Sequence, residues 1–344
     1  MAEFGKHLQE LNPIPEPLRR KWQQNDMVPL WETENDIFAP PREQPRHWPW
    51  SVMRPILVET SEITDPAIIE RRVLQLVNPT AEIAGGDATA GLMNAALQAL
   101  RAGESARPHR HSINALRFIL EGNGAQTIVN GRPCRMTPGD LVLTPAWAWH
   151  EHRHDGGAVS IWLDVLDGNL HRILGQAIFQ PGPAIDLEPA GDEPSSACAT
   201  IEPVHHGKAP DVFRYPWNDA ERVLNAAPAG PDGVRKARYI NPATRGACLP
   251  LIDCWLQQID AGGQSVAASS PADTVVSVVE GEGVSRIGDR EIQWSAKDTF
   301  TIPRRTVASH MASKMSRLFF ASNVEVYRRL GLAEQGTGTQ QPGA

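Results

Sequence analysis

Two stretches of this chain repeat each other, and the repeat constrains the fold more than any other feature. "FILEGNGAQTIVNGRPCRMTPGDLVLTP" at 118–145 matches "SVVEGEGVSRIGDREIQWSAKDTFTIP" at 277–303. Asp140 matches Asp298, and in each copy a proline follows the aspartate after five residues. Both stretches consist of short β-rich runs separated by turns, including the hairpin signal "NG" at 130–131. The chain therefore contains two copies of one β-domain, and such closely spaced strands favour a barrel or a jelly roll.

Composition around the two copies predicts an all-β fold of two jelly-roll barrels with a partly helical N-terminal extension. Prolines and short helix-like pieces are typical of the extension, and a segment rich in Pro, Ala, Gly and acids reads as a connector. The predicted segments are an extension over 1–85, a first barrel over 86–180, a connector with a short helix over 181–245, a second barrel over 246–330 and a disordered tail over 331–344.

The overall composition argues against several classes of function. The 344 residues carry a net charge of −7 with no basic cluster, so we expect neither nucleic acid nor a membrane surface as a partner. No apolar run approaches the roughly 18 residues that a spanning helix needs, and the start "MAEFGKHLQELNPIP" has no apolar signal core. Four cysteines without CxxC pairing indicate reduced thiols. We expect a cytoplasmic protein.

A histidine constellation lies in the first copy and suggests a metal site. His109 and His111 are two residues apart, so on a strand they project from the same face. His150 follows a turn and a further strand, and a neighbouring strand of one barrel would bring it beside the pair. Three imidazoles with open positions opposite them suit iron(II), manganese, copper or zinc. For the pair alone, the alternative is that the two histidines are polar residues at the edge of a strand and bind no metal.

The second copy serves as an internal control for this site. Projection by the shared fixed points puts Ala268 and Ser270 where the His-x-His pair stands, and Ala308 where the third histidine stands. His310 lies nearby without a partner, and we interpret it as an ordinary polar residue. The sequence therefore predicts one metal per chain, in the first barrel.

These motifs together resemble the two-motif signature of the cupin superfamily, a small β-barrel that holds a metal inside. The resemblance rests on the His-x-His pair, the Gly139-Asp140 turn, Pro145 and the third histidine. Many cupins add a glutamate four or five residues after the second histidine, where this chain has Ala115 and Leu116. We therefore expect three histidine ligands and no carboxylate.

A chain of two cupin barrels with an active N-terminal half resembles the gentisate/salicylate 1,2-dioxygenase family. The similarity includes "PLWE" at 29–32, "ERRVLQLVNP" at 70–79, "PHRHSINALRFILEGNG" at 108–124, "LTPAWAWHEH" at 143–152 and "FRYPW" at 213–217. The resemblance implies an iron(II) enzyme that uses dioxygen to open the ring of an aromatic ortho-hydroxycarboxylate, between the carbon that bears the carboxylate and the carbon that bears the hydroxyl. It also implies one iron per chain and a homotetramer.

Two arginine positions are candidates for binding the substrate's carboxylate. If one unbroken strand runs from the His-x-His pair to Arg117, this residue has the parity of the pair, and its guanidinium should point into the barrel, where a planar fork suits a carboxylate. The alternative is a structural ion pair. Arg72 is a second carboxylate clamp by resemblance, and its neighbour Arg71 is the alternative to it.

Three further residues complete the candidate catalytic site. His152 should share the face of His150 and serve as a hydrogen-bond partner or acid–base group for the substrate hydroxyl; a fourth ligand or a surface histidine are the alternatives. Asp164 would orient His152 or a ligand imidazole, unless it is an exposed carboxylate at the rim. Gln98 is a polar substrate contact by position, and His154 is interpreted as a surface residue.

The segment before the first motif departs from the family. Relatives commonly read Leu-Trp-Ala-Gly-Leu-Gln there, whereas this chain has "MNAALQ", with Asn94 in place of the aromatic residue and Ala96 in place of the glycine. The amide of Asn94 both donates and accepts hydrogen bonds, whereas the indole of a tryptophan presents a flat apolar surface and a single N–H donor. The change favours a salicylate with a polar group at ring position 5, hydroxyl (gentisate) or nitro. Two other functions stay open: a metal-dependent isomerase or decarboxylase, and a non-catalytic ligand-binding protein on the same barrels.

Overall fold

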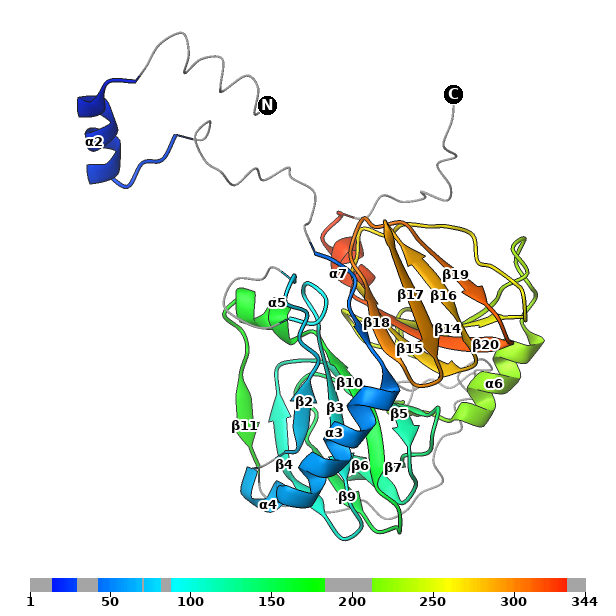
Figure 1. Cartoon of the computed structure of the whole chain (residues 1–344). Helices are drawn as coiled ribbons and strands as arrows, with labels where there is room; N and C mark the ends of the chain where they lie inside the picture. Colours follow the sequence, from blue (N-terminus) through cyan, green and yellow to red (C-terminus); the bar gives the residue numbers. More distant parts are fainter. Residues whose placement is uncertain (1–13, 30–42, 70, 82–87, 183–211, 333–344) are drawn as a thin grey trace. The chain divides into compact units, whose positions relative to one another are not determined.

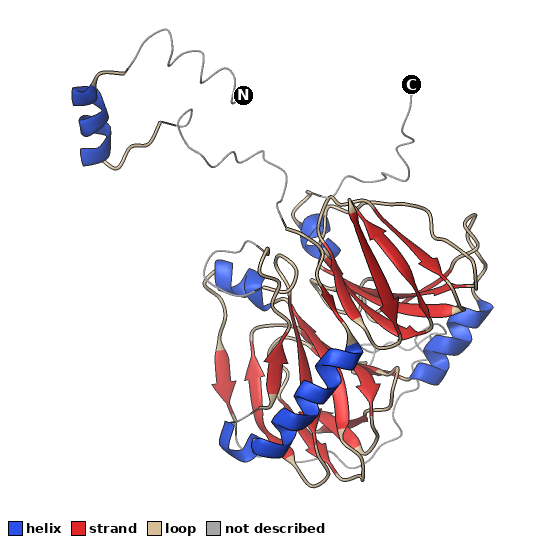
Figure 2. Ribbon diagram, viewed as in Figure 1, coloured by secondary structure: helices blue, strands red, loops and turns tan. Residues whose placement is uncertain are grey.

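A computed structural model describes residues 14–29, 43–69, 71–81, 88–182 and 212–332. The chain divides into two compact units, Met1–Pro41 and Arg42–Ala344. The first unit contains helix α2 (Glu16–Gln24), and strands dominate the second (Figure 2). Residues 183–211 of the predicted connector, the predicted tail from 333 onwards and residues 30–32 of "PLWE" lie outside the described residues.

The first barrel consists of a large and a small sheet (Figure 1). The large sheet has the order β12 (Arg214–Tyr215), β8 (Leu141–Thr144), β5 (Ala115–Glu121), β10 (Ser160–Leu166), β3 (Asn94–Leu100), β2 (Val73–Gln75). The small sheet has the order β11 (Phe179–Pro181), β4 (Ser105–His111), β9 (His150–His154), β6 (Ala125–Val129), β7 (Arg132–Arg135). Asn130 and Gly131 both have positive φ, 49° and 84°, in the two-residue turn between β6 and β7. The "NG" hairpin prediction is confirmed.

The second barrel repeats this plan and confirms the duplication. Its large sheet has the order β1 (His47–Trp48), β18 (Thr299–Ile302), β15 (Thr274–Glu280), β20 (Ser316–Ser322), β14 (Asp253–Ile259), β13 (Arg235–Arg238). Its small sheet consists of β17 (Arg290–Ser295), β16 (Glu282–Ile287) and β19 (Ala308–Ala312). The remaining helices are α3 (Trp50–Ile63), α4 (Pro66–Ile69), α5 (Gly168–Ile173), α6 (Trp217–Ala226) and α7 (Val324–Arg329).

The outer faces of the two large sheets form one hydrophobic core. Successive residues of a strand point to opposite faces, so Leu116 and Phe118 of β5 leave the first barrel and meet Phe319 and Ala321 of β20. The rings of Phe118 and Phe319 stack with centroids 4.2 Å apart. Burying one such side chain contributes about 1.5–3 kcal/mol. This core leaves the alternate residues of the same strands to line the barrel interiors.

Each barrel includes a short edge strand from a segment outside its own repeat. The helix that follows this strand packs on the other barrel. Strand β1 joins the second barrel, and the following α3 buries Met53 and Leu57 in the shared core beside β3. Strand β12 joins the first barrel, and the following α6 lies against β13 and β14. The sequence prediction missed this exchange because strands of two residues carry no periodicity, and their partners are far away in the chain.

The repeated aspartates explain how these helices are anchored. Asp140 accepts a hydrogen bond from the backbone N–H of Trp217, the first residue of α6, at 2.7 Å. Asp298 accepts one from the N–H of Trp50, the first residue of α3, also at 2.7 Å. The first N–H groups of a helix have no partner inside the helix. Each barrel therefore caps the helix that follows its own short edge strand.

Replacing Asp140 by alanine is expected to lower the free energy of unfolding by about 2–4 kcal/mol. The change removes the cap of α6 and leaves the half-buried guanidinium of Arg214, 3.0 Å from Asp140 Oδ2, without its carboxylate. Urea unfolding measures the loss, with the exposed Glu59→Ala as the control. Equal midpoints for the two variants would contradict the capping role.

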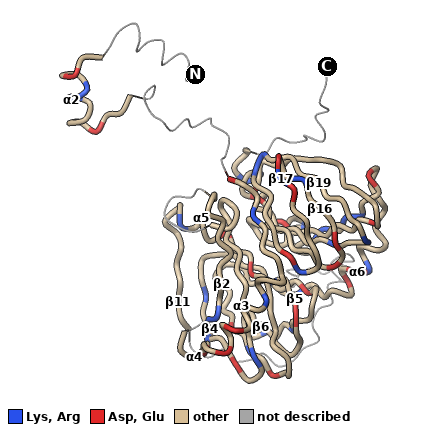
Figure 3. The backbone as a smooth tube through the Cα atoms, in the orientation of Figure 1, with Lys and Arg blue, Asp and Glu red and all other residues tan. Residues whose placement is uncertain are grey.

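Acidic and basic positions are interspersed along both barrels (Figure 3), as expected from a sequence without a basic cluster. Among the described residues, no helix has the length and apolar character required to cross a membrane.

Candidate active site

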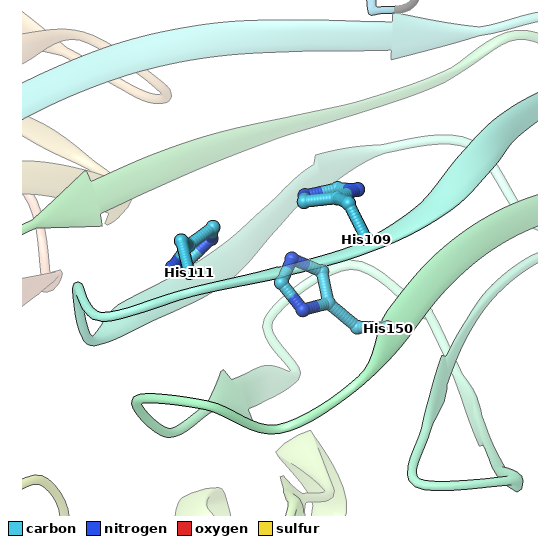
Figure 4. A group of neighbouring side chains, drawn as sticks. All are labelled: His109, His111 and His150. Atoms are coloured by element: carbon cyan, nitrogen blue, oxygen red, sulfur yellow. The ribbon is translucent and has the colours of Figure 1, made fainter. Parts of the chain in front are cut away.

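The structure brings the three predicted metal ligands together inside the first barrel. Strands β4 and β9 are antiparallel neighbours, and their register sets His109 directly opposite His150. His111 shares the face of His109 because it lies two residues further along β4. One ring nitrogen from each histidine lies within 4.8 Å of the others, and all three side chains are buried. Figure 4 shows the three rings turned toward one another.

Backbone carbonyls fix the tautomer of each of these rings. The Nδ1 atom of every ligand histidine lies 2.7–3.0 Å from a carbonyl oxygen two residues away in the chain. A carbonyl oxygen only accepts, so each Nδ1 carries the proton and each Nε2 has a lone pair. His150 Nε2 is buried and has no hydrogen-bond partner among the described residues. The residues present therefore fit a metal that takes imidazole Nε2 ligands.

Burial keeps the three imidazoles neutral, as a metal requires. It lowers the pKa of His109 to about 3 and that of His111 to about 4, and it lowers the pKa of His150 well below its ordinary value. The positive charges of Arg71 and Arg117 act in the same direction. Neutral nitrogen donors without a carboxylate in the cluster suit a transition metal rather than calcium or magnesium.

Arg117 points into the barrel, as predicted, but the premise of one unbroken strand is wrong, because β4 ends at His111 and β5 begins at Ala115 in the other sheet. It is buried, and its Nη1 donates to Thr144 Oγ1 at 2.8 Å. Its Nε lies 3.3 Å from Asp164 Oδ1. A buried guanidinium within reach of the histidines is a suitable group for a carboxylate ligand.

The position of Asp164 corrects one prediction. This carboxylate does not orient His152; it pairs with Arg117, because β5 and β10 are neighbours and their register sets the two residues opposite each other. It is also buried, not exposed at the rim, and burial raises its pKa to about 6 against the opposing charge of Arg117. Both alternatives given for Arg117, inward-facing group and ion-pair partner, therefore describe the same side chain.

His152 lies in the barrel interior on the face of His150. Its Nδ1 lies 3.0 Å from Thr127 Oγ1, and its buried Nε2 has no hydrogen-bond partner in the described part of the chain. The interpretation of His154 as a surface residue is wrong. That ring is buried and donates from Nε2 to the Ala158 carbonyl at 2.6 Å. This hydrogen bond fixes the position of the loop after β9.

Arg72 does not reach the site, and Arg71 does. The Arg72 side chain is fully buried in an ion pair with Glu104 at 2.7 Å and also donates to Thr64. Nη1 of Arg71 lies 3.0 Å from His109 Nε2. Adjacent residues of an extended segment project to opposite sides, so only one of the two arginines can face inward. The sequence could not decide which.

Phe179 is a neighbour of the site that the sequence did not indicate. Its half-exposed ring stacks on His109 with centroids 5.3 Å apart, and the Arg71 guanidinium lies 5.0 Å from its centre. The residue belongs to β11, which pairs with β4. No local pattern could have identified it, because this pairing joins segments about 70 residues apart.

Residues from β3 line the same interior. Asn94, Ala96 and Gln98 alternate onto the barrel-facing side of the strand, with Ala96 opposite Asp164. The buried Nε2 of Gln98 has no hydrogen-bond partner among the residues described. Asn94 begins β3 and lies beside Gly168. All three predicted positions therefore lie on the face that carries the site.

The second barrel lacks this chemistry at each equivalent position. The bridge between Ala268 and Ala308 stands where β4 and β9 pair two ligand histidines, which confirms the projection. Apolar side chains replace three polar ones of the first barrel: Val276 for Arg117, Phe320 for Asp164 and Ile302 for Thr144. The larger Trp255 stands in place of Ala96, and its ring stacks on that of Phe320 with centroids 5.1 Å apart. Apolar side chains therefore fill the part of the second barrel that corresponds to the site.

Known proteins share both the sequence and this fold. A family profile described as a cupin domain matches residues 96–166. Gentisate 1,2 dioxygenase 1 from Aquipseudomonas alcaligenes is 34% identical over 325 residues, which cover 90% of this chain and 93% of that protein. The chain belongs to the gentisate/salicylate 1,2-dioxygenase family.

Two further comparisons agree with this membership. The 5-aminosalicylate 1,2-dioxygenase of a Comamonas species is 31% identical, over 89% of this chain and 86% of that protein. Salicylate 1,2-dioxygenase from Pseudoaminobacter salicylatoxidans, in a crystal structure of its adducts with gentisate, superposes with a TM-score of 0.85 and 28% identity, over 95% of this chain and 96% of that one. As a member of this family, the chain is an aromatic ring-cleaving dioxygenase.

Proposed function

We propose that this dioxygenase uses iron(II) and dioxygen to open the ring of a salicylate-type substrate, between the carboxylate-bearing carbon and the adjacent hydroxyl-bearing carbon. The observation that carries the proposal is the convergence of three neutral imidazoles beside the buried guanidinium of Arg117. A substrate with neighbouring carboxylate and hydroxyl groups matches that pairing of a metal site with a fixed cation.

His109, His111 and His150 would hold the iron through Nε2. When bound, iron(II) supplies a centre at which dioxygen and the substrate's two oxygen groups come together. The protein keeps the three rings in position through their Nδ1–H donors to backbone carbonyls. We therefore expect one iron ion per chain, in the first barrel.

The other inward side chains orient the substrate. Arg117 binds its carboxylate, and Arg71, whose Nη1 lies beside His109, is a second cation for it. Gln98 supplies an amide N–H, and His152 presents its Nε2 to the ring hydroxyl. Neither atom has a hydrogen-bond partner in the part of the chain that the structure describes. Because these groups are buried, their interactions with the substrate are stronger than in water, and the ring is held in one orientation.

The test of this function is anaerobic reconstitution with iron(II), followed by oxygen together with salicylate, gentisate, 5-aminosalicylate or 5-nitrosalicylate. We expect loss of the aromatic absorbance with one dioxygen consumed per ring. An isomerase or decarboxylase would change the substrate without oxygen uptake, and a ligand-binding protein would leave it intact. Absence of oxygen uptake with every ortho-hydroxybenzoate would rule the proposal out.

Asn94 is proposed to select the substituent at ring position 5. The Asn94→Trp variant should lower kcat/KM for gentisate and 5-nitrosalicylate relative to salicylate by about tenfold, since a polar contact in a pocket is worth about 1–3 kcal/mol. Competition assays with paired substrates measure this ratio, and equal iron content in both proteins is the control. An unchanged ratio would remove Asn94 from the proposal.

We also propose that the chain assembles as a homotetramer. The exposed face of α3 carries Val52, Ile56 and Ile63, and the adjacent α4 exposes Ile68. Contiguous aliphatic surface of this kind is typical of an interface between subunits. Light scattering of the purified protein gives the mass directly.

A further inference from the structure

The two barrels share a pair of residues that the metal chemistry alone does not explain. In the first barrel, His152 Nδ1 lies 3.0 Å from Thr127 Oγ1, and the register of β6 and β9 sets the two residues opposite each other. In the second barrel, His310 Nδ1 lies 2.7 Å from Ser285 Oγ at the equivalent place between β16 and β19. His310 is therefore the counterpart of His152, not an isolated polar residue. The histidine–hydroxyl pair belongs to the repeated frame of the barrel.

The two pairs differ in what the hydroxyl contacts next. Thr127 Oγ1 donates to the Met136 sulfur at 3.2 Å. Ser285 Oγ instead accepts from the indole N–H of Trp294 at 2.8 Å. Met136 and Trp294 occupy equivalent positions, because Met136 donates its backbone N–H to Ala125 and Trp294 pairs with Gly283 on the matching strand. The second neighbour of the hydroxyl is thus an acceptor in the first barrel and a donor in the second.

This change reverses the direction of the hydrogen bond to the histidine. A hydroxyl has a single proton to donate. Ser285 receives the indole N–H and is left with its own proton for His310 Nδ1, which puts the ring proton of His310 on Nε2. Met136 offers an acceptor for the Thr127 proton, and with the proton there the Thr127 oxygen accepts from His152 Nδ1–H. His152 is then left with a lone pair on Nε2, inside the barrel.

We propose that Thr127 and Met136 are positioning residues that hold His152 in its Nδ1–H tautomer, so that Nε2 accepts a hydrogen bond from the substrate's ring hydroxyl. The identity of the ligand in this inference rests on the proposed function. The tautomer rests on the equivalent strand registers, β6 with β9 and β16 with β19, that align the two histidine–hydroxyl pairs. In the opposite tautomer, His152 would present an N–H at Nε2, where the proton of the substrate's hydroxyl needs an acceptor. The role of His152 therefore depends on a side chain that it does not contact, Met136, through the hydroxyl of Thr127.

The direct test is nitrogen-15 NMR of the full chain loaded with zinc, a diamagnetic ion, with labelled histidine. We expect His152 to be protonated at Nδ1 and His310 at Nε2, with assignments from His152→Gln and His310→Gln. Met136→Leu removes the sulfur acceptor and should shift His152 toward the Nε2–H form. A His152 ring protonated at Nε2 in the unmodified chain would overturn the proposal. This readout needs no turnover, so its failure is distinguishable from failure of the proposed function.

Kinetics of the iron-loaded protein supply the second test. Thr127→Val should lower kcat by about 10- to 100-fold, a loss typical of a residue that orients another one, with unchanged iron content. Thr127→Ser retains the hydroxyl and should restore kcat to within about threefold of the unmodified protein. The matched change in the other barrel, Ser285→Ala, should leave kcat unaltered. Equal losses in Thr127→Val and Ser285→Ala would show a purely structural role and overturn the assignment.

Discussion

Replacing His109 by alanine is expected to leave the chain without bound iron and without ring cleavage. The variant keeps two imidazoles of the three that converge within 4.8 Å, and it loses the ligand that sits directly opposite His150. We expect iron content to fall from about one per chain to below about 0.1, and turnover to fall at least about 1,000-fold. Metal analysis after desalting and oxygen uptake measure the two losses.

His310→Ala is the matched control for that experiment. His310 is a buried histidine in the repeated frame, but it stands in the barrel whose ligand positions are Ala268 and Ala308. The variant should keep its iron and its turnover, while it loses about 1–3 kcal/mol of stability because the buried hydroxyl proton of Ser285 is left without the His310 acceptor. Near-stoichiometric iron in His109→Ala, or loss of iron in His310→Ala, would contradict the assignment of the metal to the first barrel.

Arg117→Met is expected to have two separate effects. It removes the cation for the substrate's carboxylate, which should raise KM at least about 100-fold, since a charge-assisted pair in a buried site is worth several kcal/mol. It also leaves the buried carboxyl of Asp164 without its partner, which should cost about 3–5 kcal/mol of stability. Steady-state kinetics and urea unfolding separate the two.

The double variant Arg117→Met, Asp164→Leu tells substrate binding apart from the ion pair. Replacing both members of a buried pair by apolar residues is often neutral for stability, and the second barrel already has this arrangement with Val276 and Phe320. We expect the double variant to regain the stability of the unmodified chain and to keep the high KM. A return of KM to its original value would show that Arg117 serves only to pair with Asp164.

The metal site could be predicted because its determinants are local. Residues two apart on a strand project from the same face. His109 and His111 therefore point to the same side, whichever strands are their neighbours. The repeat with Ala268 and Ala308 assigned the three-histidine cluster to one barrel. The inward direction of Arg117 was predicted from a strand continuous with that of His111, whereas the structure ends that strand at His111. These inferences needed no knowledge of which strands are neighbours, beyond the placement of His150.

The partners of the buried polar groups could not be predicted in the same way. Asp164 faces Arg117 across two strands that are about 45 residues apart in the chain, and only their register joins them. Arg72 and Arg71 are equivalent in the sequence, yet one is buried against Glu104 and the other meets His109. A buried charge must be paired, but the sequence does not say with what.

The sequence by itself determined that the chain contains two barrels, which of them carries the histidine cluster, and which three imidazoles form it. The tertiary structure decided how the remaining polar residues are divided between substrate and scaffold: Arg71 to the site and Arg72 to an ion pair, Asp164 to Arg117, and His152 to Thr127. The physical reason is the range of the interactions. Strand parity acts over two residues, whereas the hydrogen bond or ion pair that satisfies a buried group depends on strand neighbours and register, which exist only in the folded chain.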